Sequence, residues 1–196
     1  KVKYSDLKNK RVFITGGGSG IGASIVEHFC EQGSDVYFVD IDLKETKKLL
    51  NKIKKNKFKT PTFIECNLLD INKLEKIIKN IISKKGPIHV LVNNAANDDR
   101  HTTDQVDEKY WENRMAINLK HYFFAAKAVV KSMKKMKAGS IVNLSSVSWM
   151  LGEGDKVVYE TAKSAVVGLT RSFAQEYGKY NIRTNSVVPG SIATER

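Results

Sequence analysis

Two side chains near the end of the sequence, Tyr159 and Lys163, have the types and the spacing for proton transfer. They stand four residues apart in an amphipathic stretch, so they share one face of a helix. An ammonium beside a phenol favours the phenolate, which lowers the pKa of a tyrosine from its ordinary value of about 10. The spacing therefore predicts Tyr159 as a general base near neutral pH. Y-x-x-x-K alone occurs often by chance, and its weight here comes from Ser145 and Ser146, which close an apolar run shortly before it.

A glycine-rich stretch, TGGGSGIG at 15–22, follows an apolar run and leads directly into an amphipathic one. Glycines permit a tight turn and let the backbone approach a pyrophosphate. The N-terminus of the following helix supplies amide donors and a positive dipole end. Glycines also build plain turns, but a strand before and a helix after favour nucleotide binding.

Asp40 ends the second apolar run, eighteen residues after Gly22. An acidic side chain in that place accepts hydrogen bonds from both ribose hydroxyls of an adenosine and repels a 2′-phosphate. The alternative is a helix cap, formed by Asp40 or Asp42. Because no arginine follows Asp40 to hold a 2′-phosphate, the sequence favours NAD over NADP.

These residues stand where short apolar runs end and helical patterns begin. Runs rich in β-branched residues predict strands at 11–15, 35–40, 61–66, 89–94, 140–146 and 183–189. Apolar side chains at helical spacing predict helices at 21–33, 71–83, about 110–137 and about 156–177. Such alternation predicts one α/β domain over 1–196, built on a doubly wound parallel sheet covered on both faces. In such sheets ligands bind beyond the carboxyl ends of the strands.

The composition argues against several classes of protein. With 41% apolar and 28% charged residues, the 196-residue chain is expected to be globular. No apolar run approaches the roughly 20 residues that span a bilayer, and the N-terminal residues lack the apolar core of a secretory signal. Cys30 and Cys66 lie in unrelated segments, so no disulfide and a cytoplasmic location are expected.

The net charge of +12 raises the question of a nucleic-acid partner. The excess lies in lysine-rich stretches, 44–59 and 131–137, and arginine is scarce. Around the helical apolar stripe of Leu49, Leu50 and Ile53, lysines cover the remaining surface, which favours a solvated helix face over a nucleic-acid site. The four histidines show no metal-binding spacing, so no metal is expected; they are His28, His89, His101 and His121.

Six elements, taken together and in chain order, resemble the short-chain dehydrogenase/reductase family. They are Thr15-Gly16-x-x-x-Gly20-x-Gly22, Asn93-Asn94-Ala95, Asn118, Ser146, Tyr159-x-x-x-Lys163 and Pro189-Gly190. Ser146 lies thirteen residues before Tyr159, a spacing similar to that of the family, and the match spans essentially the whole chain. The resemblance implies a single Rossmann-like domain and an NAD-dependent oxidoreductase.

The resemblance also implies a role for each matching residue. Tyr159 would be the catalytic acid/base, and Lys163 would hold the nicotinamide ribose. Ser146 would hydrogen-bond the reacting oxygen, and Asn118 would anchor a water of the proton relay, although an amide inside a helix can also mark a kink. The implied cofactor-binding residues are Gly16, Ser19, Gly20, Ile21, Gly22, Asp40, Asn67, Leu68, Asn94, Ala95, Tyr159, Lys163, Pro189, Ile192 and Thr194. Among them, Asn67 departs from the aspartate that the family usually has.

Two variable stretches, NNAANDDRH at 93–101 and SSVSWMLG at 145–152, look like those of bacterial aldose 1-dehydrogenases of the D-xylose or L-fucose type. That resemblance implies hydride transfer from C1 of an aldose to NAD, which yields a lactone. A sugar needs several polar partners, because each buried hydroxyl must be hydrogen-bonded. The candidates to face it are Asn97, Ser146, Ser148, Trp149 and Tyr159. For Asn97, Ser148 and Trp149, a role in merely supporting the cleft is an equal alternative.

Two alternatives remain from the sequence. One is a dehydrogenase for another secondary alcohol. The other is a catalytically silent dinucleotide-binding protein, suggested by the end of the sequence at Arg196, beyond which family members continue through a substrate-covering helix and a last strand. The sequence is thus expected to be C-terminally truncated relative to the family. Family members usually pair through the helices of Asn118 and Tyr159, which implies a homodimer or homotetramer with a small-molecule substrate and no membrane or nucleic-acid partner.

Overall fold

Six parallel strands form the central sheet, in the order β3-β2-β1-β4-β5-β6. The computed structural model describes residues 2–194. The strands are β1 (Arg11–Thr15), β2 (Asp35–Asp40), β3 (Thr62–Glu65), β4 (Val90–Asn93), β5 (Gly139–Leu144) and β6 (Ile182–Val187). The doubly wound parallel sheet predicted from the sequence is confirmed: β1 and β2 have the predicted bounds, and the ends of the other strands differ by one or two residues.

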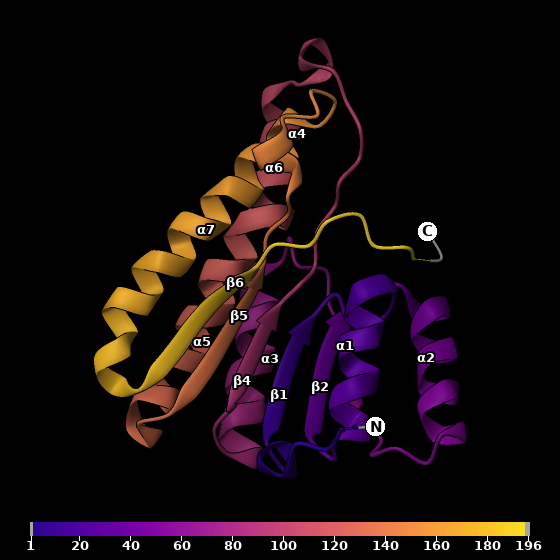
Figure 1. Ribbon diagram of the computed structural model, residues 1–196, viewed down its shortest axis with the longest axis vertical. Coiled ribbons are helices and arrows are strands. Elements are labelled where there is room, and N and C mark those ends of the chain that lie inside the picture. Colours follow the sequence, from indigo (N-terminus) through magenta and orange to yellow (C-terminus); the bar gives the residue numbers. More distant parts are fainter. Residues whose placement is uncertain (1, 195–196) are drawn as a thin grey trace.

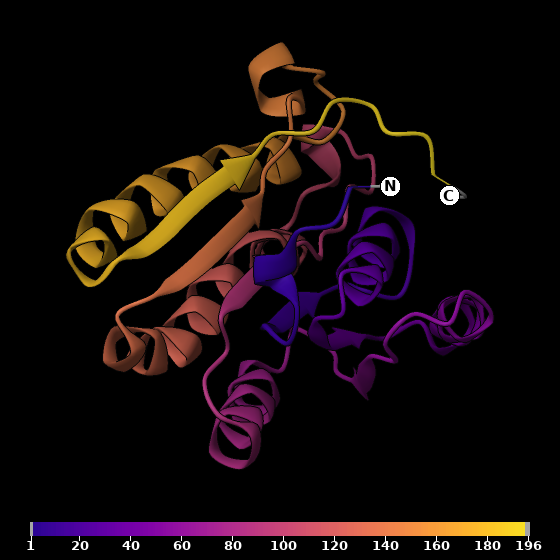
Figure 2. The same cartoon turned by 60° about the horizontal axis from the view of Figure 1, so that its bottom comes forward.

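The helices that connect the strands lie on both faces of the sheet (Figures 1 and 2). They are α1 (Gly20–Glu31), α2 (Leu43–Lys55), α3 (Ile71–Lys85), α4 (Glu108–Met115), α5 (His121–Met136), α6 (Ser148–Leu151) and α7 (Val157–Tyr177). Short 3₁₀ turns are η1 (Ser5–Leu7), η2 (Thr103–Gln105) and η4 (Gly178–Tyr180), and η3 (Ala116–Lys120) is a π-helical turn. Several helices begin at aspartates: the side chains of Asp42, Asp70 and Asp107 accept from backbone amides of the first turns of α2, α3 and α4.

Alternate strand residues supply two separate cores, because successive side chains of a strand point to opposite faces. Phe13, Val39 and Leu91 pack with the helices α3, α5 and α7 on one face. Val12, Ile14 and Phe38 pack with α1 and α2 on the other. Cys30 and Cys66 are free thiols, each buried in a different core.

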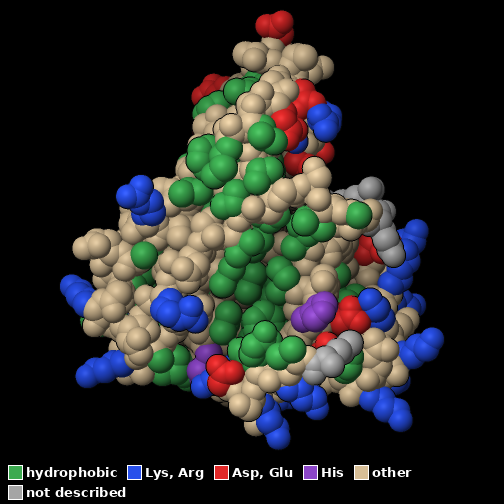
Figure 3. All heavy atoms as spheres, viewed as in Figure 1, with side chains coloured by type: hydrophobic (Ala, Val, Ile, Leu, Met, Phe, Trp, Pro, Cys, Tyr) green, Lys and Arg blue, Asp and Glu red, His purple; other side chains and the backbone are tan. Residues whose placement is uncertain are grey.

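The second face is only partly covered in the described chain. Within residues 2–194 no helix packs over β5 and β6 on the side of α1 and α2, and Val90 and Val142 are only partly buried there. Figure 3 shows apolar side chains gathered in the hollow over β1, β4 and β5. Among the helices of residues 2–194, none is long and apolar enough to cross a membrane.

The helix expected over about 110–137 is interrupted, which corrects the sequence-based prediction. A π-helical turn separates α4 from α5, and the fully buried Asn118 lies in its middle. A π turn inserts an extra residue into the helix and is frequent at functional sites. The amide that the sequence marked as either functional or a kink thus stands at a real irregularity of the helix.

Candidate active site

A cavity of about 660 Å³ lies at the carboxyl ends of the strands. After β6, the chain runs across these ends toward α1 (Figure 1). All fifteen residues that the resemblance implies for the cofactor line this cavity: Gly16, Ser19, Gly20, Ile21, Gly22, Asp40, Asn67, Leu68, Asn94, Ala95, Tyr159, Lys163, Pro189, Ile192 and Thr194. The cavity has two ends, which we call the cofactor end (15–22, Asp40 and Asn67) and the substrate end (97–101 and 146–156).

Backbone groups shape the cofactor end. Gly20 begins α1 with a φ of +53°, and a Cβ there would face the cavity beside Thr194 at 3.7 Å. A Cβ on Gly22 would overlap the carbonyl oxygen of Gly16, so this close approach requires glycine. The side chain of Asn94 fixes the same turn by donating to the carbonyls of Thr15 and Gly16 at 3.1 and 2.9 Å. The N-terminus of this twelve-residue helix, whose first turn carries no acidic side chain, fits a pyrophosphate.

The side chain of Asp40 closes the cofactor end. Its two carboxylate oxygens accept from the backbone amides of Gly18 at 2.7 Å and of Ile41 and Asp42 at 2.7 and 2.9 Å. Asp40 is therefore held in place by the turn rather than used as a helix cap, a role that Asp42 takes for α2. Asn67 accepts from the amide of Leu69 at 3.0 Å, which leaves its amide nitrogen at the cavity wall.

Ser146, Tyr159 and Lys163 come together at the middle of the cavity. Ser146 follows the end of β5, and its hydroxyl lies 2.9 Å from that of the buried Ser148. Tyr159 and Lys163 lie one turn apart near the start of α7, with the Lys163 nitrogen 5.6 Å from the centre of the Tyr159 ring. The Ser145 hydroxyl donates to the carbonyl of Lys163 at 2.7 Å and so fastens this turn of α7 to β5.

The ammonium of Lys163 is anchored on the protein side of the cavity. It donates to the carbonyl of Leu144 at 2.7 Å and to the hydroxyl of Tyr122 at 2.9 Å. Tyr122 lies on α5, four residues after Asn118, and is completely buried. The sequence reasoning missed Tyr122; its spacing from Asn118, which places both on one helix face, is the signal that could have found it.

The electrostatics of this group correct one expectation. Burial raises the pKa of Tyr159 above its usual value, Asp98 and Glu153 raise it further, and a hydrogen bond with Ser146 opposes them. Burial also lowers the pKa of Lys163 to about 7, a change that Asp98 opposes. The expectation of a lowered Tyr159 pKa is thus wrong for this structure, because burial of the phenol outweighs the other influences on it.

Asn118 lies behind the cavity rather than on its wall. Its side-chain oxygen accepts from the amide of Asn97 at 2.8 Å, and its nitrogen donates to the Asn97 carbonyl at 2.9 Å. Asn118 therefore fixes the start of the loop after β4. Its proposed part in a proton relay remains a prediction.

Three side-chain contacts hold the substrate end together, two of them between distant segments. Arg100 forms an ion pair with Asp155, and Lys156 pairs with Glu153 at 2.6 Å. His101 accepts from the amide of Val158, in the first turn of α7, at 3.3 Å. The loop after β4 is thus tied to the start of α7, the helix that carries Tyr159. The sequence reasoning missed these contacts; Lys156 and Glu153 stand at i,i+3 spacing, whereas no local pattern marks the other two.

The three candidates for substrate contact differ in placement. Asn97 and Ser148 line the cavity. Trp149 does not, and its indole nitrogen is buried without a hydrogen-bond partner among residues 2–194. The structure adds Asp98, Arg100, Glu153 and Lys156 to the wall instead, and leaves the roles of all these residues as proposals. Within the described chain, no three His, Cys, Asp or Glu side chains are grouped as metal ligands.

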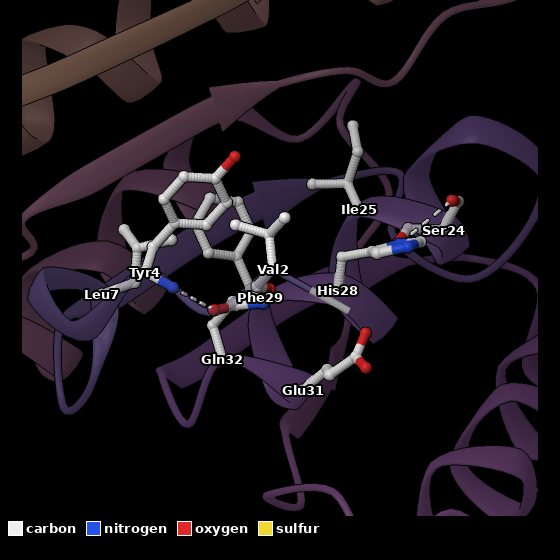
Figure 4. Close-up of a pocket in the computed structure, with 9 residues that line it drawn as sticks. All are labelled: Val2, Tyr4, Leu7, Ser24, Ile25, His28, Phe29, Glu31 and Gln32. Carbon is white, nitrogen blue, oxygen red and sulfur yellow. Dashed lines mark hydrogen bonds between the residues drawn. The ribbon is translucent and has the colours of Figure 1, made fainter.

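A second hollow, of about 440 Å³, lies between the N-terminal segment and α1. Figure 4 shows its residues, of which Tyr4 donates its amide to the side chain of Gln32 at 2.8 Å, and His28 bonds the carbonyl of Ser24 at 2.7 Å. These polar groups are used in fastening the N-terminal segment and α1 themselves. The hollow is therefore read as a packing groove.

Comparisons with known proteins agree with this geometry. The sequence model of a family described as short chain dehydrogenase matches residues 10–196. A probable galactose dehydrogenase of Rhizobium meliloti is 41% identical over 99% of this chain and 76% of its own length. A D-xylose 1-dehydrogenase of Caulobacter vibrioides is 42% identical over 98% of this chain and 76% of its own. The solved structure of an aldohexose dehydrogenase from Thermoplasma acidophilum has a TM-score of 0.86 at 33% identity, covering 98% of this chain and 70% of that one.

Proposed function

The chain belongs to the short-chain dehydrogenase family, and from this membership and its cavity we propose that it oxidises an aldose at C1 with NAD to give a lactone. Its relatives support an oxidoreductase that uses a nicotinamide dinucleotide. The observation that carries the finer proposal is the cavity itself. It joins a glycine turn and Asp40 at one end to Ser146, Tyr159 and Lys163 and to a polar wall at the other.

Three side chains have separate roles in the proposed reaction. The Ser146 hydroxyl donates to the oxygen on C1 and holds it beside Tyr159. The Tyr159 oxygen takes the proton of that hydroxyl as the C1–H bond breaks. Lys163, anchored at the end of β5, presents its ammonium near the Tyr159 ring. When bound, the oxidised nicotinamide supplies the hydride acceptor and a positive charge in the same cavity.

The raised pKa of Tyr159 sets the pH dependence of the reaction. Oxidation needs the phenolate to take up a proton, so its rate is expected to rise with pH until Lys163 loses its charge near pH 7. Reduction of a lactone needs the protonated phenol and is favoured on the acid side.

Asp40 supports NAD over NADP. Its carboxylate lies at the cavity wall where the adenosine ribose would bind, and three backbone amides hold it there. A 2′-phosphate would meet this negative charge. Of the residues that line the cavity, the arginine and lysines (Arg100, Lys156 and Lys163) belong to the substrate end or the catalytic group rather than to the ribose.

The polar wall of the substrate end supports a sugar as substrate. Asn97, Asp98, Glu153 and Lys156 offer both donors and acceptors at the cavity surface. A site built to hydrogen-bond hydroxyls strongly discriminates against analogues that lack them, because its buried polar groups would be left unpaired. The relatives named as galactose, D-xylose and aldohexose dehydrogenases fit the same substrate class.

The test is a panel of aldoses, including D-xylose, D-galactose and L-fucose, beside simple secondary alcohols, each with NAD and with NADP. Absorbance of the reduced cofactor and mass spectrometry of the product are the readouts. We expect turnover on at least one aldose with NAD and a product that has lost two hydrogens. Turnover on the secondary alcohols alone would support the first alternative, and NADH binding by fluorescence without any turnover would support the silent one.

Pairing of copies through α5 and α7 is part of the same proposal. Phe123 on α5 is 43% exposed although its ring packs on Phe173 of α7, with ring centres 5.9 Å apart. An exposed aromatic side chain at the seam of two helices fits an interface. Sedimentation is expected to give a dimer or tetramer, and a smaller species for Phe123→Glu.

A further inference from the structure

The hydroxyl of Tyr122 lies at a buried junction between elements that are distant in sequence. It donates to the carbonyl of Leu144, the last residue of β5, at 2.9 Å and accepts from the ammonium of Lys163 on α7 at 2.9 Å. The carbonyl of Ala95, just after β4, lies 3.5 Å away. Tyr122 itself belongs to the first turn of α5 and is 0% exposed. Its oxygen therefore links α5, β5 and α7 directly beneath the cavity.

The hydrogen bonds at this junction give each group one role. A phenol has a single proton, which Tyr122 gives to Leu144, so its lone pairs remain for the ammonium. Lys163 has three N–H donors, of which two are used by Tyr122 and Leu144. The third is left on the cavity side, where Lys163 forms part of the wall. The junction thus fixes both the place and the direction of the lysine.

Because Lys163 is buried, its charge depends on these hydrogen bonds. The residue is only 1% exposed, and burial lowers its pKa to about 7. Hydrogen bonds from an ammonium to oxygen acceptors favour the charged form, so each acceptor lost lowers the pKa further. The Lys163 stem has four rotatable carbons, and without its anchors the charge would not stay at the end of β5.

The other titratable groups around the ammonium do not replace Tyr122 as its hydrogen-bond acceptor. Asp98, in the loop after β4, favours the charged lysine. His121, beside Tyr122 on α5, is kept neutral because burial and Lys163 lower its pKa to about 3. Tyr159 on α7 lies at the cavity, and burial raises its pKa. Burial raises the pKa of the Tyr122 phenol far above its usual value, so it remains a neutral acceptor throughout the working pH range.

We propose that Tyr122 is a positioning residue of this active site, whose hydroxyl holds the Lys163 ammonium at the end of β5 and helps keep it protonated beside Tyr159. The consequence for catalysis rests on the proposed function, whereas the hold on Lys163 does not. A mere packing role makes a different prediction. The Tyr122 ring lies 4.5 Å from that of His121, so a phenylalanine would preserve the packing and change nothing else.

The test compares Tyr122→Phe with Tyr177→Phe. Tyr177 is also a buried tyrosine, 6% exposed and stacked on Phe173, but it lies at the far end of α7. In protein labelled with ¹³C at lysine Cε, the Lys163 signal, assigned with Lys163→Arg, reports its titration directly. We expect the pKa of Lys163 to fall by about one unit in Tyr122→Phe, since a hydrogen bond to a charged group is lost, and to stay unchanged in Tyr177→Phe.

Kinetics supply the second readout. For Tyr122→Phe we expect the break in the pH profile at which Lys163 loses its proton to move to lower pH and kcat at pH 7 to fall about tenfold, with KM for the aldose nearly unchanged. An unchanged Lys163 titration in a folded Tyr122→Phe would overturn the proposal, whatever the activity. A shifted titration without turnover on any aldose would instead overturn the proposed function and leave Tyr122 in its role.

A further measurement does not depend on the folding of that variant. 3-Fluorotyrosine placed at position 122 alone reports on the phenol by ¹⁹F resonance. Its signal is expected to move with the titration of Lys163 and to lose that transition in Lys163→Met. A signal that does not respond to the lysine would also overturn the proposal.

Discussion

The cofactor end and the substrate end of the cavity meet at Ser146 and Tyr159, yet they are built from different material. At the cofactor end, backbone groups of the glycine turn and the start of α1 form the wall, and Asn94 and Asp40 hydrogen-bond to that backbone. At the substrate end, side chains pair across loops that are far apart in sequence, as Arg100 does with Asp155. The path of the backbone shapes the cofactor end, whereas pairs of side chains shape the substrate end.

This difference has an energetic consequence. A Cβ at Gly22 would overlap the carbonyl oxygen of Gly16, so the glycine turn tolerates almost no substitution. The Arg100 side chain is 68% exposed, and an ion pair of that kind contributes about 0–1 kcal/mol. The cofactor end is thus constrained and the substrate end adjustable, which suits a fold that keeps one cofactor while its substrate varies.

The largest expected effect distinguishes the rate of catalysis from the affinity for the cofactor. Tyr159→Phe removes only the hydroxyl of the proposed acid/base, so kcat should fall by about 10²–10⁴-fold while the Kd for NADH changes by less than about threefold. Stopped-flow turnover and NADH fluorescence measure the two quantities, with Tyr177→Phe as the control. Equal losses in both would mean that Tyr159 serves mainly to bind the cofactor.

A comparison of two glycine substitutions tests the cofactor end alone. Gly22→Ala places a methyl group against the Gly16 carbonyl and should lower the free energy of unfolding by about 3 kcal/mol and weaken NADH binding strongly. Gly168→Ala, at an exposed site in the middle of α7 with no atom within 4 Å of the added Cβ, should raise it by about 0.5–1 kcal/mol. Denaturant melts check both values. A Gly22→Ala protein that still binds NADH normally would contradict the description of this turn.

Asp40→Asn tests how the cofactor end chooses its ligand. The neutral amide keeps an acceptor oxygen but loses the charge that would repel a 2′-phosphate. The ratio of kcat/KM with NADP to that with NAD should therefore rise by about tenfold or more. Asp42→Asn changes the neighbouring charge while Asn still caps α2, and should leave the ratio unchanged. The same rise in both variants would assign the effect to general charge.

The smallest effect belongs to the substrate end. Arg100→Gln breaks the ion pair with Asp155, and KM for the aldose should rise by at most about fivefold with kcat and NADH affinity unchanged. Asp155→Asn and the double variant complete a cycle in which the two losses should not add. Lys79→Gln, which breaks a pair with Glu75 on α3 at 2.6 Å, is the distant control. Fully additive losses would show that the pair has no coupled role.

The same contrast explains what the sequence could and could not predict. The sheet, the glycine turn and Asp40 follow from local signals: apolar runs, glycine spacing and the residue that closes a strand. All fifteen residues implied for the cofactor line one cavity, because the carboxyl ends of parallel strands meet at one edge. Their individual roles still await experiment.

The details of the substrate end could not be predicted, because two of its contacts join residues more than fifty positions apart. No periodicity links Arg100 to Asp155 or His101 to Val158. Trp149, a candidate for substrate contact, does not line the cavity, and burial of the Tyr159 phenol raises its pKa where a lowered one was expected. Burial depends on the assembled fold, so a pKa direction argued from helical spacing alone lacked its largest cause.

The most direct test of the central claim is the fate of the hydrogen on C1. D-Xylose deuterated at C1, or whichever aldose is turned over best, is oxidised with NAD, and the reduced cofactor is weighed by mass spectrometry. If Tyr159 and Ser146 serve an aldose 1-dehydrogenase, the deuterium appears in the reduced cofactor and the other product is the unlabelled lactone. Deuterium retained in the sugar product, with unlabelled reduced cofactor, would show oxidation at another carbon and contradict the account.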